Sequence, residues 1–132
     1  MLIKRSKIKR GFPNVYPSYW DIPGGSVEEN ELPREAALRE AMEEVNQKLQ
    51  INKIIHEDSQ FDASKDTVFT RLVYAGEILE ERDFILDPEE HTDFVCFSSL
   101  EDMVGEFIVP YLLKYTMQKK SPFDKGIFLI SF

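Results

Sequence analysis

Residues 24–47 read GGSVEENELPREAALREAMEEVNQ, and this stretch decides how the rest of the chain is interpreted. From Pro33 to about Lys48, apolar residues recur at the period of an amphipathic helix. The predicted apolar stripe consists of Leu38, Ala41, Met42, Val45 and Leu49. Gly24 and Gly25 precede the helix, and backbone without a Cβ can approach a ligand or an ion closely. The stretch therefore predicts a glycine-rich loop that leads into one helix.

Three carboxylates stand at i, i+3 and i+4 within this helix, at Glu40, Glu43 and Glu44. Residues at this spacing project from one face, where like charges repel one another. The three glutamates are predicted to face away from the apolar stripe, so one interpretation is a solvated acidic surface. The other is a magnesium or manganese site, because hard divalent cations take carboxylate oxygens as ligands.

The spacing of six residues favours the metal site. These residues are Gly25, Glu31, Arg39, Glu40, Glu43 and Glu44. Their order resembles the signature of the Nudix (MutT-like) hydrolases, Gly-x5-Glu-x7-Arg-Glu-U-x-Glu-Glu-x-Gly-U, in which U is a bulky aliphatic residue. The lead-in Trp20-Asp21-Ile22-Pro23-Gly24-Gly25 also resembles the usual sequence of that family. The signature spans residues 25–47, and a looser resemblance in strand order extends over most of the chain.

The chain departs from the family pattern at positions that carry no predicted metal ligand. Asn46 replaces a glycine that ends the helix in the left-handed conformation, which asparagine also adopts. Gln47 occupies an aliphatic position, and Leu49 is expected to supply the missing contact. Leu32 stands where a serine or threonine often caps the helix, so we expect about 1 kcal/mol less capping energy. The first strand, at Leu2-Ile3-Lys4-Arg5, is apparently shortened, and an incomplete sheet edge would favour a homodimer.

The resemblance implies a Mg²⁺-dependent hydrolase, with Mn²⁺ as an alternative ion, acting on a nucleoside diphosphate linked to another moiety. The metal ligands it implies are Glu40, Glu44, Glu43 and the carbonyl of Gly25. The residues it implies for catalysis are Glu43, Glu44, Arg39 and Glu90. Arg39 would orient the carboxylates with Glu31 as its structural partner, next to the structural Gly24. Glu90, favoured over Glu89 as the general base, lies in the loop 87–91, whose acids are alternatively only solvated.

Substrate contacts are predicted upstream of the signature. Arg5 at the end of the first strand is expected to reach a substrate phosphate, with a plain surface charge as the alternative. Tyr19, or its neighbours Tyr16 and Phe12, could stack on a base, although aromatic residues beside a short strand also serve as core. His56 and His91 lack partners at metal-ligand spacing and are expected to be structural or exposed.

The remaining pattern predicts one α/β (α+β) domain over residues 1–132, a mixed sheet sandwiched between helices. A loop is predicted over residues 7–18 and a second helix from Phe107 to Lys119, with Pro110 in its first turn. The tail 126–132 is expected to be an edge strand or a docked apolar tail. The other predicted strands are Tyr19–Ile22, 51–61, 67–78 and Phe94–Phe97.

The charge and composition of the chain restrict the classes of partner that it is expected to bind. The 132 residues carry a net charge of −8 at pH 7, although five of the first ten are cationic: Lys4, Arg5, Lys7, Lys9 and Arg10. An acidic body argues against nucleic-acid binding, which needs a basic surface. No apolar stretch approaches the ~18 residues that cross a bilayer, so no membrane partner is expected. The single cysteine, Cys96, is predicted to be a buried structural thiol, and one cysteine fits a reducing, cytoplasmic location.

Small size favours a nucleoside triphosphate as the substrate, including an oxidised one such as 8-oxo-dGTP, split into the monophosphate and pyrophosphate. ADP-ribose or another nucleoside-diphosphate sugar is the alternative small-molecule substrate. A non-catalytic module that binds a nucleotide for regulation is the alternative of a different class. Loss of a helix carboxylate would favour that module, and all three glutamates are present.

Overall fold

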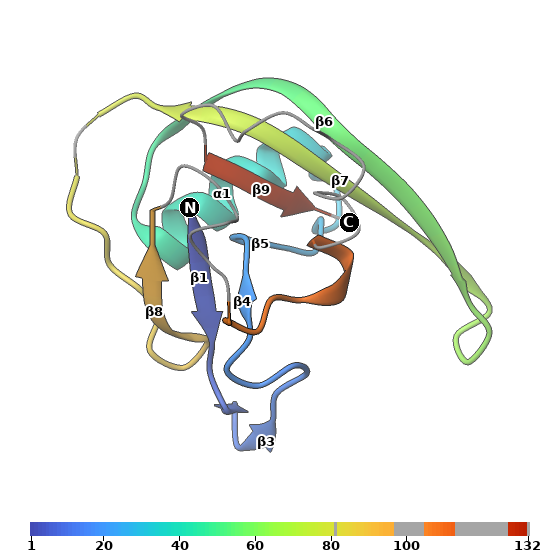
Figure 1. Ribbon diagram of the computed structural model, residues 1–132. Coiled ribbons are helices and arrows are strands. Elements are labelled where there is room, and N and C mark those ends of the chain that lie inside the picture. Colours follow the sequence, from blue (N-terminus) through green and yellow to red (C-terminus); the bar gives the residue numbers. More distant parts are fainter. Residues whose placement is uncertain (81, 97–104, 113–126, 132) are drawn as a thin grey trace.

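The computed structural model describes residues 1–80, 82–96, 105–112 and 127–131 (Figure 1). The helix it describes in full is α1 (Pro33–Val45). The strands are β1 (Leu2–Arg5), β2 (Ile8–Lys9), β3 (Phe12–Pro13), β4 (Trp20–Asp21), β5 (Gly24–Gly25), β6 (Leu49–Asp62), β7 (Thr67–Ile78), β8 (His91–Val95) and β9 (Ile127–Ser131). None of the helices in these residues is long and apolar enough to cross a membrane.

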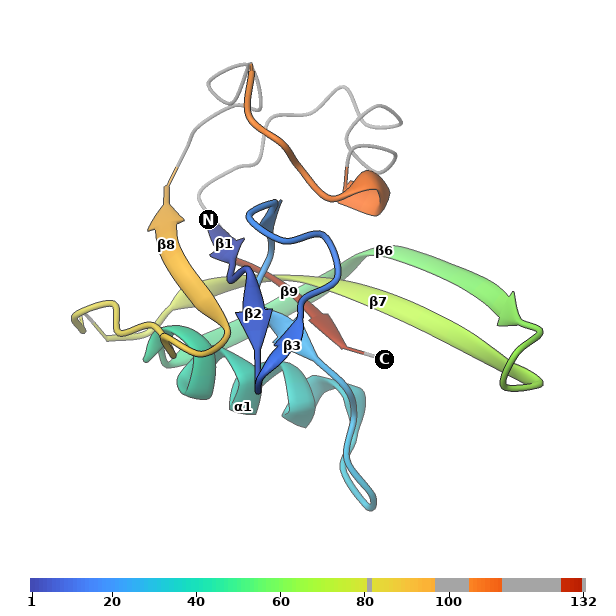
Figure 2. The same ribbon diagram turned by 90° about the horizontal axis from the view of Figure 1, so that it is seen from below.

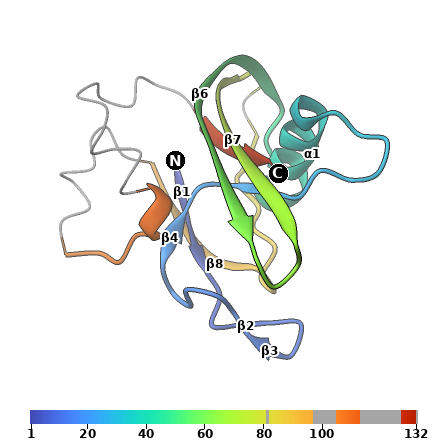
Figure 3. The same cartoon turned by 90° about the vertical axis from the view of Figure 1, so that its right-hand side faces the viewer.

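The strands form two sheets and a small hairpin. The first sheet has the order β4-β1-β8 with antiparallel pairing throughout. The second has the order β5-β9-β7-β6, in which only β5 and β9 run parallel. The long β6–β7 hairpin projects from the body of the molecule (Figures 1 and 3). The second sheet is therefore mixed, as the fold-class prediction expected, whereas the first is antiparallel.

Side chains alternate across the sheets and divide the core in two. On one side Ile3 and Tyr74 pack against α1 through Ala37, Ala41 and Val45. On the other side their strand neighbours Leu2 and Val73 pack with Ile108, Val109 and Leu112. Successive strand residues point to opposite faces, so one pair of strands supplies both clusters. Figure 2 shows α1 and the 105–112 segment on opposite sides of the strands, which agrees with a sheet between two layers.

The helix begins at Pro33 as predicted but ends at Val45, before the predicted Lys48, and its buried face is different. Leu32 supplies no side-chain cap, and Asn46 ends the helix in the left-handed region at φ 57°. Leu38 and Met42 are 38% and 37% exposed rather than buried in the apolar stripe. The buried face is built from Ala36, Ala37, Ala41, Glu44 and Val45. Ala37 and Ala41 pack with Ile3 and Tyr74, whereas the longer side chains of Leu38 and Met42 lie toward solvent.

Three segments differ from the sequence prediction because long-range pairing decides where they begin and end. Residues 7–18 contain the β2–β3 hairpin, since Arg10 and Gly11 take the positive φ values of a tight turn. The strand β8 begins at His91 and ends at Val95, so Cys96 lies beyond its end. Cys96 is exposed rather than buried. Residues 107–109 pair with Trp20, so helical structure starts only at Pro110. Residues 113–119 of the predicted second helix lie outside the described residues.

The C-terminal strand corrects the prediction of an edge strand or a docked tail. β9 lies inside its sheet, with β7 on one side and β5 on the other. It occupies this place because β6 pairs with only one edge of β7, which leaves the other edge for β9. The four-residue β1 is likewise paired on both sides. The homodimer stays a prediction that sedimentation at micromolar protein would test.

Candidate functional site

Glu44 is the buried centre of the acidic site. Its side chain lies on the inward face of α1, and the residue is only 5% exposed. The backbone N–H of Gly24 donates to Glu44 Oε2 over 2.8 Å. The glycine-rich strand β5 therefore sits directly against this carboxylate. The expectation that all three helix glutamates face away from the core is wrong for Glu44.

A loop from elsewhere in the chain brings a second carboxylate to Glu44. One ligand atom from each of Glu44, Glu90 and His91 lies within 4.8 Å of the others. The loop is shaped by Asp87, whose carbonyl accepts from the N–H groups of Glu90 and His91 over 3.1 and 2.9 Å. The side chain of Asp87 also accepts from the N–H of Glu89 over 3.0 Å. This turn presents Glu90, rather than Glu89, to the helix.

The two carboxylates share a proton when no cation is present. Burial raises the pKa of Glu44 to about 9, with the charge of Glu40 and the hydrogen bond to Glu90 adding to the effect against the Gly24 N–H. Burial alone would also raise the pKa of Glu90, but the ion pair with Lys9 and the hydrogen bond with Glu44 lower it. The proton therefore resides on Glu44, and Glu90 is ionised. A cation that replaced this proton would be held by two carboxylates.

His91 completes the group from the start of β8. It is buried, and burial lowers the pKa of its imidazole to about 4, so the ring is neutral at pH 7. Its Nδ1 atom has no hydrogen-bond partner within the described part of the chain. A neutral imidazole with a free nitrogen can accept a proton or a metal ion. The sequence did not indicate this grouping, because Glu44, which meets His91 and its neighbour Glu90, lies on a helix far away in the sequence.

Glu40 lies one turn before Glu44 and packs against Gly25. A Cβ built on Gly25 would overlap the carboxylate of Glu40. Burial raises the pKa of Glu40, and the hydrogen bond from Arg39 opposes that rise. Gly25 is therefore needed for the close approach of β5 to Glu40.

Arg39 organises the outer side of the acid cluster. It donates two hydrogen bonds to Glu31, from Nε to Oε1 over 2.8 Å and from Nη2 to Oε2 over 3.0 Å. The same guanidinium donates to Glu40 over 2.7 Å, to Glu43 over 3.1 Å and to the carbonyl of Ser26 over 3.1 Å. These contacts, the bonds to Glu31 first, raise the pKa of Arg39 and lower that of Glu31. Glu43 is exposed and reaches the cluster only through Arg39.

The predicted substrate residues have partners within the protein. Arg5 donates to Asp21 over 2.9 Å, to the carbonyl of Val15 over 2.7 Å and to Asn14 over 3.1 Å. Its contact with a substrate stays a prediction, as does that of Tyr19. The Tyr19 ring is half-buried and lies 5.4 Å from the rings of both Tyr16 and Phe107.

The donor set fits a hard divalent cation. Glu44 and Glu90 offer carboxylate oxygens in a partly desolvated place, where two like charges need compensation. Glu40 lies one turn earlier on the helix, against the backbone of Gly25, and is not among the three residues whose ligand atoms lie within 4.8 Å of one another. Carboxylate and carbonyl oxygens are the donors that Mg²⁺ and Mn²⁺ prefer. These residues could therefore hold such an ion, with Glu90 entering a ligand group that the sequence restricted to the helix and Gly25.

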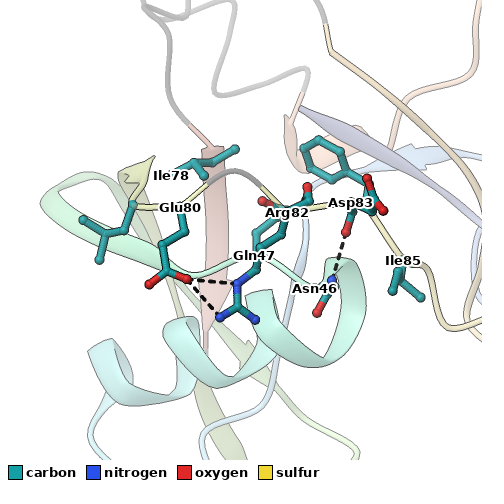
Figure 4. A pocket seen from close by; sticks show the side chains of 9 residues that line it. Asn46, Gln47, Ile78, Glu80, Arg82, Asp83 and Ile85 are labelled. Atoms are coloured by element: carbon teal, nitrogen blue, oxygen red, sulfur yellow. Dashed lines mark hydrogen bonds and ion pairs between the residues drawn. The ribbon is translucent and has the colours of Figure 1, made fainter.

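A separate hollow of about 1050 Å³ lies at the C-terminal end of α1 (Figure 4). It is lined by Asn46, Gln47, Ile78, Leu79, Glu80, Arg82, Asp83, Phe84 and Ile85. Asn46 Nδ2 donates to the carbonyl of Asp83 over 2.9 Å, and Gln47 Nε2 to that of Arg82 over 3.1 Å. None of the predicted site residues lines this hollow, so we assign it no part in the reaction.

Comparison with known proteins agrees with the arrangement. A family model described as NUDIX domain matches residues 1–119. The bovine (Bos taurus) diphosphoinositol polyphosphate phosphohydrolase 3-beta is 33% identical over 66 residues, which are 50% of this chain and 40% of that protein. The human (Homo sapiens) diphosphoinositol polyphosphate phosphohydrolase 3-alpha is 32% identical over 66 residues, again 50% and 40% of the two chains. The match thus spans about two fifths of the length of these curated relatives. No solved structure matches the chain.

Proposed function

Because the chain belongs to the NUDIX domain family, we propose that it is a Mg²⁺-dependent hydrolase of phosphoric anhydride bonds. The observation that carries the proposal is the buried Glu44 carboxylate, which shares a proton with Glu90 and lies against the glycine backbone of β5. Such a pair is costly to maintain for stability alone. It is explained when a cation and a polyanionic substrate bind there.

Each residue of the site has its own proposed role in binding the ion or in catalysis. When bound, the metal ion supplies charge neutralisation and a more acidic water. Glu44 and Glu40 hold the ion, and the carbonyl of Gly25 is the proposed backbone ligand. Glu90 lies beside Glu44, where it could also contact the ion, and is the proposed proton acceptor. Arg39 is a positioning residue that fixes Glu40 and Glu43 from the side of Glu31.

The proposed substrate is a nucleoside triphosphate, including an oxidised one, which is cleaved to the monophosphate and pyrophosphate. Tyr16 and Tyr19 support this choice, because the exposed Tyr16 ring adjoins the half-buried Tyr19 ring and such rings can stack on a base. A diphosphoinositol polyphosphate is the second candidate, favoured by the activity for which the relatives are named. ADP-ribose and nucleoside-diphosphate sugars remain the alternative with two phosphates.

The proposed location is the cytoplasm. Cys96 is the single cysteine of the sequence, so no internal disulfide can form. Its exposed thiol suits a reducing compartment.

The test is phosphate and pyrophosphate release from a panel of nucleoside triphosphates, diphosphoinositol polyphosphates and ADP-ribose. Each reaction is run with Mg²⁺, with EDTA and with the Glu44→Gln variant. We expect Mg²⁺-dependent turnover that EDTA and the variant both abolish. Tight nucleotide binding without turnover on any substrate would instead establish the regulatory module.

A further inference from the structure

We propose that the β2–β3 hairpin forms a phosphate-chain subsite next to the acidic group, in which Lys9 and Lys7 bind successive phosphates of a substrate that has at least three. The inference rests on the proposed function, because it names the substrate class of the same site. It assigns a role to the basic N-terminal segment, which no part of the metal site uses.

The hairpin is fixed against the loop that carries Glu90. The Ser6 N–H donates to the carbonyl of Glu90 over 2.9 Å, and Ser6 Oγ donates to that of Glu89 over 3.0 Å. Asn14 closes the base of the hairpin by donating its N–H to the carbonyl of Lys7 over 3.0 Å and its Nδ2 to that of Ser6 over 3.1 Å. These hydrogen bonds hold the hairpin beside the loop that carries Glu90. The hairpin lies below β1 in Figure 1.

Lys9 is the cation nearest to the buried acids. Its Nζ lies 2.9 Å from Glu90 Oε1, with the two side chains 40% and 20% exposed. An ion pair this open adds little to stability. An ammonium carries three N–H donors, and the Glu90 contact occupies one of them. The others can meet a phosphate oxygen that approaches the acids with its cation.

Lys7 extends this positive charge away from the acids. It lies at a bend directly before β2, two residues from Lys9, and its carbonyl accepts from the Asn14 N–H at the base of the hairpin. Lys7 is exposed and has no ion-pair partner among the residues that the structure describes. Arg10 adds a further exposed cation at the turn. A row of cations leading out from an acidic centre, in a chain of net charge −8, matches a linear polyphosphate.

The subsite distinguishes the substrate candidates by the number of their phosphates. A nucleoside triphosphate or a diphosphoinositol polyphosphate can occupy the acidic centre and both lysines at once. ADP-ribose and nucleoside-diphosphate sugars carry two phosphates and leave Lys7 unused. The geometry therefore favours the more highly phosphorylated class.

The experiment compares two probes that cannot be hydrolysed at their bridges, methylenediphosphonate and the methylene-bridged analogue of inorganic tripolyphosphate. Their affinities for the Mg²⁺-loaded protein are measured by calorimetry in the wild type and in Lys9→Gln, Lys9→Arg, Lys7→Gln and Lys53→Gln. Lys53 is the matched control, because it is exposed on β6 in the other sheet. The unfolding temperature of each variant shows that it is folded.

We expect the three-phosphorus probe to bind at least about 10-fold tighter than the two-phosphorus probe. Lys9→Gln should weaken both probes about 10-fold, with recovery in Lys9→Arg. Lys7→Gln should weaken only the longer probe, by about 3-fold, and Lys53→Gln neither. Equal binding of the two probes, or equal effects of Lys7→Gln and Lys53→Gln, would overturn the subsite.

Turnover of the substrate panel separates this inference from the proposed function. Mg²⁺-dependent hydrolysis without a lysine-dependent preference for the longer probe overturns the subsite and leaves the hydrolase. A lysine-dependent preference without any turnover overturns the hydrolase and leaves the subsite.

Discussion

The carboxylate of Glu44, buried on the inward face of α1, shares one proton with Glu90 from the loop before β8. A single residue thereby links the folding energy of the protein to its proposed chemistry. The folded chain must hold Glu44 either protonated or next to a cation. Both states can be measured.

The first prediction is that Glu44→Gln stabilises the metal-free protein. Between pH 4.5 and about 9 the unfolded glutamate is ionised whereas the folded one keeps its proton, so rising pH favours unfolding. Glutamine imitates the protonated acid, since it can accept from Gly24 and donate to Glu90. We expect roughly 2 kcal/mol of added stability near pH 8, measured by urea unfolding in EDTA. A wild type whose stability relative to the variant stays constant from pH 7 to 9 would contradict this prediction.

The second prediction is that binding of Mg²⁺ releases about one proton per site near pH 7.5, because Glu44 must ionise to become a ligand. The affinity for Mg²⁺ should rise with pH until the pKa of Glu44 is passed. Calorimetry in two buffers of different ionisation enthalpy measures the released proton. Glu44→Gln is the control, and proton release that persists in this variant would assign the effect to another group.

The sequence predicted the chemistry of the site better than its geometry. The glutamate spacing and Gly25 indicated a metal site, because that pattern lies within one short segment. Helical periodicity located α1 but did not show which face docks, since alanines at Ala37 and Ala41 allow a closer approach than Leu38 would. Glu44 was therefore predicted to face away from the core.

Contacts between distant segments were the least predictable. The approach of Lys9 to Glu90 depends on the pairing of β1 with β8, which no local pattern encodes. The place of β9 inside its sheet has the same cause, since the strand reads as an apolar tail until the free edge of β7 is known. Loop acids could be proposed from the sequence, but the turn at Asp87 was needed to show that Glu90 is the one that lies near Glu44.

The third prediction concerns Gly25→Ala. The added Cβ would displace the Glu40 carboxylate, so Mg²⁺ affinity and kcat/KM should each fall about 10-fold or more while the fold persists. Ser26→Ala is the matched control, because only the backbone carbonyl of Ser26 meets Arg39. Mg²⁺ titration and steady-state kinetics measure both effects. Equal behaviour of the two variants would remove Glu40 from the site.

The fourth prediction concerns Arg39→Lys, which keeps the charge but loses the bidentate hydrogen bonding to Glu31. We expect kcat to fall about 10-fold with little change in KM, because the helix acids lose their orientation. Glu28→Gln is the control, since exposed Glu28 lies 3.8 Å from the same guanidinium and should change kcat less than twofold. A lysine variant with wild-type kcat would show that charge alone suffices.

The last prediction separates two roles of Arg5. Its guanidinium pairs with buried Asp21, which also accepts from the hydroxyl of Tyr111. Arg5→Gln and Tyr111→Phe should therefore both lower the free energy of unfolding, by about 2 and 1 kcal/mol, as urea denaturation would show. Asp21, Val15 and Asn14 use three of the five N–H donors of Arg5, and the other two can reach a phosphate. Only the Arg5 variant should therefore also raise KM. If KM is the same in both variants, Arg5 is a structural residue whose task is to hold Asp21.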